Sequence, residues 1–174
     1  DRHAGLALRD PIEAQDAVLA LHKVQIAGAH SDQGGGALEV TGGSVLLDAV
    51  DIHDSDGRNG GALSAVNADV TITGSTFPGN TATSHGGAVF VSYPTSLAVK
   101  GSTFDGNTAI GQGGAMYLEG RTATASLDVS GTFTGNSSRN EGGAIYVRTT
   151  SDGLKDGKLT IGSATFTGNA GNVG

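Results

Sequence analysis

The sequence predicts an all-β fold, a right-handed parallel β-helix with about six to seven coils of 25–29 residues and three short strands per coil. The first observation behind this prediction is the triplet Gly-Gly-Ala, which occurs five times at spacings of 25, 26, 27 and 29 residues. The second is the motif Phe-x-Gly-Asn, which occurs four times, and whose Asn lies six residues before the next Gly-Gly pair in three copies. A unit of this length cannot bury an apolar face alone, whereas stacked coils can. The triplets begin at Gly35, Gly60, Gly86, Gly113 and Gly142.

Short alternating segments between these landmarks are the third observation. One follows the triplet directly, as in Val89-Phe90-Val91, and a second precedes Phe-x-Gly-Asn, as in Val70-Thr71-Ile72. Alternation with period two predicts strands with one buried face. Because crossover connections between parallel strands are right-handed, we expect a right-handed coil. The expected second strands cover residues 45–47, 70–72, 97–99, 127–129 and 159–161.

The Phe-x-Gly-Asn motifs predict two internal ladders. The Phe side chains are expected to stack inward, and the Asn side chains to sit at a bend where their amides bond to one another and to turn backbone. Ile26 and Ile52 replace Phe in the first two copies, and Ala29 and Ser55 replace Asn. Asn136 also starts a formal glycosylation sequence, which we discount because that Asn belongs to the internal ladder. The ladder residues are Phe77, Phe104, Phe133, Phe166, Asn80, Asn107, Asn136 and Asn169.

The two ends of the sequence fit the repeat less well. At residues 9–17, Asp10 and Pro11 have the pattern of a helix start, which predicts a loop or a short helical excursion from the coil. The chain begins with Asp rather than Met and stops within a repeat after Asn169. We therefore expect one β-helix segment over residues 1–174 that is an excerpt of a longer solenoid.

Composition removes several classes of function. The net charge of −7 argues against a nucleic-acid partner or an anionic membrane surface. The absence of Cys excludes disulfides, zinc–thiolate sites and cysteine nucleophiles. No apolar run reaches the ~18 residues of a membrane-spanning helix, so we expect no membrane insertion by this segment.

The repeats resemble those of the chlamydial polymorphic outer-membrane proteins. That family is defined by Gly-Gly-Ala-(Ile/Leu/Val) and Phe-x-x-Asn tetrads, which are matched here by Gly142–Ile145, Gly86–Val89 and the four Phe-x-Gly-Asn copies. The similarity covers residues 34–174 and departs from the family where Phe is missing in the first two coils. It implies a secreted or surface-exposed right-handed β-helix that is often used in adhesion, and it supplies no catalytic residues.

Acidic residues near the second coil form the one candidate metal site. Asp51, Asp54 and Asp56 lie within one six-residue segment, and His30 and Asp32 lie one coil earlier, so stacking could gather ligands for calcium or another cation. Turn formation is the alternative reading of this segment. The five histidines occupy different offsets within the repeat, so we expect no metal-binding histidine row and no other cofactor. Asp152-Gly153 and Asp156-Gly157 are interpreted as turns of a protruding loop, with ligand contact as the alternative.

These observations favour a structural or adhesive segment of an extracellular or cell-surface protein rather than an enzyme. The expected partners are other copies of the chain, through end-to-end stacking into a filament or scaffold, or other surface proteins, and glycans are a further option. A carbohydrate-active or carbohydrate-binding β-helix is the alternative, which the lack of Trp disfavours. Ice binding, which needs a maintained Thr-x-Thr row, is disfavoured because the counterparts of Thr71-Ile72-Thr73 in neighbouring coils, residues 46–48, 98–100 and 128–130, lack the pattern.

Overall fold

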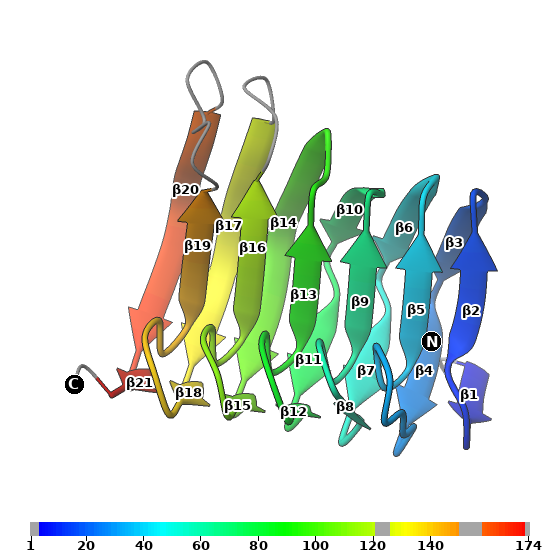
Figure 1. Ribbon diagram of the computed structural model, residues 1–174, viewed down its shortest axis with the longest axis horizontal. Coiled ribbons are helices and arrows are strands. Elements are labelled where there is room, and N and C mark those ends of the chain that lie inside the picture. The colour runs from blue at the N-terminus through cyan, green and yellow to red at the C-terminus, as the bar shows by residue number, and fades with distance from the viewer. Residues whose placement is uncertain (1–3, 121–125, 150–157, 173–174) are drawn as a thin grey trace.

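The protein, seen here as a computed structural model, is a parallel β-helix, as predicted (Figure 1). The structure describes residues 4–120, 126–149 and 158–172, and these contain strands and no helix. In Figure 1 the chain rises along the nearer sheet and descends along the sheet behind it while it advances from right to left, which is the right-handed sense. All strand pairs are parallel and join successive coils.

The first sheet contains the strands that follow the Gly-Gly-Ala triplets. Six strands stack in it, so the chain completes about five turns between the first and the last. This is slightly fewer than the predicted six to seven coils, because the residues before β2 supply only the single strand β1. The strands of the first sheet are β2 (Ile12–Gln15), β5 (Leu38–Thr41), β9 (Leu63–Val66), β13 (Val89–Ser92), β16 (Met116–Gly120) and β19 (Ile145–Thr149).

The second sheet has ten strands and combines two columns. In the early coils the columns are separate strands, and from β14 onward each coil crosses both columns with one long strand whose register shifts midway. Its strands are β1 (Ala4–Ala7), β3 (Val18–His22), β4 (Val24–Ala27), β6 (Ser44–Asp48), β7 (Asp51–His53), β10 (Asp69–Thr73), β11 (Thr76–Pro78), β14 (Ser96–Asp105), β17 (Ser126–Thr134) and β20 (Lys158–Thr167).

The third sheet is a narrow corner of two-residue strands that follow the Asn positions. Because each strand is so short, this sheet turns the chain toward the loop that carries the next Gly-Gly pair. Its strands are β8 (Asp56–Gly57), β12 (Thr81–Ala82), β15 (Thr108–Ala109), β18 (Ser137–Ser138) and β21 (Ala170–Gly171).

Residues 9–17 form neither a helix nor only a loop, so that prediction is wrong. The segment contains strand β2, which pairs in register with β5, with bends at residues 9–10 and 16–17. Ile12 and Ala14 alternate inward onto the core, and Glu13 and Gln15 point outward. Burial of that alternating face outweighs the local helix-start signal of Asp10 and Pro11.

The predicted phenylalanine ladder is present. Successive rings from Phe77 to Phe166 stack at centroid separations of 4.9, 4.8 and 5.0 Å, close to the spacing between strands. Phe77, Phe104 and Phe133 are fully buried. Ile26 and Ile52 pair in register ahead of this column and continue it as aliphatic side chains.

The predicted asparagine ladder is also present. The side-chain oxygen of Asn107 accepts bonds from both the backbone N–H and the side-chain amide of Asn80, at 2.9 and 3.2 Å. The Asn107 amide in turn donates to the Phe77 carbonyl at 2.8 Å and to Asn136 at 2.9 Å. Asn136 is fully buried, which agrees with its interpretation as a ladder residue rather than a glycosylation acceptor.

The paired glycines are required by the close approach of successive coils. Gly113 has a φ of +72°, a conformation that residues with a Cβ rarely adopt. A Cβ on Gly114 would overlap the carbonyl oxygen of Gly143 in the next coil. The pair therefore combines a left-handed turn with a backbone-to-backbone contact that no larger residue allows.

Candidate functional site

The aspartates proposed as a metal site do not converge. Asp51 accepts bonds from Gln25 and Thr76, both at 2.9 Å, which tie it to the coils on either side. Asp54 pairs with the adjacent His53, with 2.8 Å between Nδ1 and Oδ2. The carboxylates of Asp51 and Asp54 therefore bind different protein groups and do not face a common point.

His30 and Asp32 were expected near this cluster, and His30 contacts it at one residue only. Its Nδ1 bonds the carboxylate of Asp56 in the next coil, and its Nε2 lies 3.3 Å from Asp32. Within the described ranges, no group of three or more His, Cys, Asp or Glu side chains is arranged to hold a metal ion. The calcium-site interpretation of Asp51, Asp54 and Asp56 is thus not supported. The predicted loop at residues 152–157 lies outside the described residues.

A row of rings on the outer face of the first sheet is a feature that the sequence interpretation missed. Phe90, Tyr117 and Tyr146, termed here the aromatic row, occupy the same outward position on β13, β16 and β19. Their rings stack at 5.2 and 5.5 Å, and His85 stacks on Tyr117 at 4.7 Å. The missed signal is an aromatic residue directly after Gly-Gly-Ala-x in three consecutive repeats.

The aromatic row directs its ring edges, rather than its ring faces, to solvent. Stacking along the solenoid axis uses both faces of Tyr117, which is only 3% exposed. A sugar packs against the face of an aromatic ring, so the stacked rings offer it little surface. The row is better suited to edge contacts with a second surface.

Charged side chains border the aromatic row. The Nε of Arg148 lies 3.8 Å from Glu119. Burial is the main cause that raises the pKa of Tyr117, and the interaction with Arg148 opposes it. The pKa of His85 is lowered, first by burial against Tyr117 and then by the charge of Arg148. At neutral pH this end of the face therefore presents neutral rings beside an ion pair.

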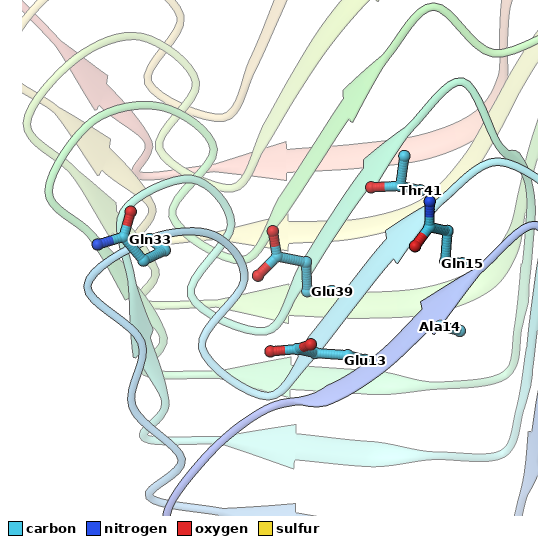
Figure 2. A pocket seen from close by; sticks show the side chains of 6 residues that line it. All are labelled: Glu13, Ala14, Gln15, Gln33, Glu39 and Thr41. Carbon is cyan, nitrogen blue, oxygen red and sulfur yellow. The ribbon is translucent and has the colours of Figure 1, made fainter.

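The N-terminal end of the same face is an acidic depression of about 580 Å³ (Figure 2). Glu13 and Glu39 are direct neighbours on β2 and β5, and both carboxylates extend toward the side of the loop that carries Gln33 (Figure 2). The Glu39 carboxylate presses against Gly34, where a Cβ would overlap it. Burial first, and then the charge of Glu13, raises the pKa of Glu39. Asp10, Asp32 and His30 line an adjoining hollow of about 400 Å³.

The stacked parallel coils, with inward Phe and Asn ladders and outward rows, define a repeat protein of the parallel β-helix class. The family model of the Chlamydia polymorphic membrane protein (Chlamydia_PMP) repeat matches residues 101–117 and 130–148, about a fifth of the chain. Each matched stretch contains one Phe-x-Gly-Asn motif and the Gly-Gly-Ala triplet after it. The chain thus carries repeats of this polymorphic membrane protein type, which confirms the resemblance.

This repeat family implies a surface β-helix protein. No curated protein and no solved structure matches the chain. In the described part of the chain, no helix has the length and apolar character needed to cross a membrane.

Proposed function

We propose that this chain is a structural or adhesive segment of an extracellular or cell-surface protein, and that it presents the outer face of its first sheet to a partner protein. The observation that supports the proposal most is the aromatic row, because its members Phe90 and Tyr146 are partly exposed, Arg148 borders it, and Phe, Tyr and Arg are enriched in protein interfaces. The repeat family supports a surface location.

The opposite outer surface favours the first sheet as the contact face. On the second sheet the corresponding outward column contains mostly small or polar side chains, which suit a solvated surface. That column consists of Ala20, Leu46, Thr71, Ala98 and Asp128, in register from coil to coil.

The structural part of the proposal rests on the continuity of the interior. The Phe and Asn ladders connect successive coils without a break from Phe77 to Asn169, and they are buried except for their last members, Phe166 and Asn169. Each coil contacts only its neighbours, so such a stack behaves as a rod whose stiffness comes from side-chain stacking and backbone hydrogen bonds. Other copies of the chain are proposed as partners through the same coil-on-coil pairing.

An attachment assay tests the adhesive part. Beads coated with the chain are applied to cultured cells, and Tyr146→Ser/Arg148→Ser is compared with the control Thr71→Ser/Ala98→Ser on the second sheet. We expect about a tenfold loss of attachment for the first pair, because removal of interface hot-spot residues typically weakens binding by this much or more. We expect little change for the control. Circular dichroism melting verifies that both variants fold.

Three outcomes separate the alternatives. Equal attachment by both variants would remove the first sheet as the contact face. Attachment that glycosidase treatment of the cells abolishes, and protease treatment does not, would favour the carbohydrate-binding alternative. Attachment no greater than that of an unrelated protein of equal net charge would leave only the structural role, which sedimentation velocity tests through concentration-dependent filament growth.

A further inference from the structure

Two histidine–aspartate pairs join the first coil to the second. His22 and Asp48 are register partners on β3 and β6, with 2.7 Å between Nδ1 and Oδ2. His30 and Asp56 are partners in a parallel bridge, and their side chains are also hydrogen-bonded. Both pairs span 26 residues, one coil of chain, so each fastens one coil to the next.

A pair of like charges opposes these contacts at the same junction. Glu13 and Glu39 are register partners on β2 and β5, and like charges directly opposite each other destabilise a strand pair. Glu39 is partly desolvated against Gly34, which strengthens the repulsion between the two ionised carboxylates. On the first sheet, repulsion between Glu13 and Glu39 therefore destabilises the contact between the two coils at neutral pH. The His–Asp pairs stabilise the same contact away from this sheet.

The remaining charges around the junction are mostly acidic. Asp32 lies 3.3 Å from His30, and Asp10, Glu13 and Glu39 line the same hollow as His30. On the second sheet, Asp51 is bonded by Gln25, whose amide also lies 3.3 Å from Nε2 of His53. His53 itself pairs with Asp54. The cationic residues near the junction are Lys23, Arg58 and Arg9, whose backbone carbonyl accepts a bond from the His30 N–H at 3.3 Å.

Later junctions lack this arrangement in the same columns. Beyond Glu39 the outward column continues with Ser64 and Phe90. Beyond Asp48 it continues with Thr73 and Lys100, and beyond Asp56 with Thr81, Thr108 and Ser137. The combination of facing carboxylates and cross-coil His–Asp pairs is thus concentrated between coils one and two in the described part of the chain.

We propose that the junction between the first coil (residues 12–30) and the second coil (residues 38–57) is an acid-strengthened clasp, which mild acidification tightens and neutral pH loosens. Protonation of His30 converts its hydrogen bond with Asp56 into an ion pair. Protonation of Glu39 removes the repulsion from Glu13. Both events act in the same direction on the same pair of coils, which the His22–Asp48 contact also joins.

The direction of the pH effect on the junction follows from the shifted pKa values of His30 and Glu39. The Asp56 hydrogen bond and charge raise the pKa of His30, so its contribution is complete below the usual value of 6.5 and is lost as pH rises through the raised value. The raised pKa of Glu39 means that its penalty is complete above the raised value and disappears as pH falls toward 4.5. Stability of the junction therefore increases from neutral pH down to about pH 4.5.

Hydrogen exchange on the full chain tests the clasp. Amide protection is measured by mass spectrometry at pH 5.0 and 7.5, after correction for intrinsic exchange rates, in peptides from β2–β4 and in β13–β15 as the internal control. We expect protection of β2–β4 to rise at least about threefold at pH 5.0 relative to the control peptides, because a more stable junction opens locally less often. Equal ratios at the two pH values would overturn the proposal.

Variants assign the effect to the named groups. His30→Gln should reduce the change between pH 7.5 and 6, whereas His85→Gln, which lies away from the junction, should preserve it. Glu13→Gln should raise protection of β2–β4 more at pH 7.5 than at pH 5.0. This last variant removes a repulsion, so it tests the proposal even if His30→Gln loosens the first coil. Full pH dependence in His30→Gln, or no gain at pH 7.5 in Glu13→Gln, would overturn the proposal.

Discussion

The first two coils and the later coils fill the same inward positions with different side chains. Ile26 and Ile52 occupy the column that Phe77 continues, and Ala29 and Ser55 precede Asn80 in the bend. Ser55 keeps the pattern in part, because its backbone N–H donates to Asn80 at 3.1 Å. The backbone path is maintained in both regions, so the coil requires a buried apolar group and a capped bend rather than Phe and Asn themselves.

The regions differ more in where neighbouring coils are held together. In the later coils the specific contacts are internal, namely stacked rings and shared amides. In the first coils they lie at the perimeter, as His–Asp pairs and the Gln25–Asp51 bond. Internal contacts are shielded from solvent and insensitive to pH, whereas exposed ion pairs contribute little and depend on protonation. We therefore expect the later coils to be the more stable part of the rod.

Removing one ring from the Phe ladder is the largest expected disruption. Phe104 is fully buried and stacks on Phe77 and Phe133, so Phe104→Ala should cost about 3–5 kcal/mol, including two ring contacts of about 0.5–1.5 kcal/mol each. Ile52→Ala in the same column should cost about 1 kcal/mol less, because no ring stacking is lost. Urea denaturation followed by circular dichroism measures both. An equal or larger loss for Ile52→Ala would contradict the contrast between the regions.

Removing one amide from the Asn ladder should have the next largest effect. Asn107→Ala deprives the Asn80 N–H and amide of their acceptor and the Phe77 carbonyl of a donor, for an expected loss of about 2–4 kcal/mol. Ser55→Ala removes only two long bonds, at 3.3 and 3.2 Å, and should cost about 1 kcal/mol. The same denaturation experiment compares them, with Thr108→Ala at the exposed position of strand β15 as the control. Similar losses at both positions would mean that the bend, not the amide ladder, carries the stability.

The repeat made the fold and both internal ladders predictable. A ladder residue recurs at a fixed offset from the Gly-Gly pair, so the positions of Phe104 and Asn107 followed from spacing alone. The strand at residues 12–15 was not predicted, because its partner Leu38–Thr41 is distant in sequence and only pairing with it overrides Pro11. Local propensity cannot report such a contact.

The outer surface was less predictable because it is not constrained by burial. The position that carries Tyr117 and Tyr146 carries Glu13 and Glu39 in the first coils, so the aromatic signal is confined to the last three Gly-Gly-Ala repeats and does not run through the chain. The pairing of His22 and His30 with aspartates one coil later was missed because it appears only when the 26-residue separation is compared with the coil length.

The pKa values of His30 and His85 give the smallest expected effect, and they compare the first coils with the later coils directly. In the first coils the Asp56 hydrogen bond raises the pKa of His30, whereas burial and then Arg148 lower the pKa of His85 in the later coils. Acidification below pH 6.5 should therefore stabilise the junction between the first two coils. It should destabilise the stacking of His85 on Tyr117, because the charged imidazole is less stable in this partly buried position than in water. NMR titration of the ring Cε1–H signals should place the His30 midpoint above 6.5 and the His85 midpoint below it.

Two variants give the titration its controls, because each removes one charge next to one histidine. Asp56→Asn should return the His30 midpoint toward 6.5 and leave His85 unchanged, since Asp56 is the largest influence on His30 alone. Glu119→Gln should lower the His85 midpoint further, since the Glu119 charge opposes the shift there. Midpoints that coincide, or that move together in either variant, would show that the two regions share one electrostatic environment and that the perimeter pairs do not distinguish the first coils.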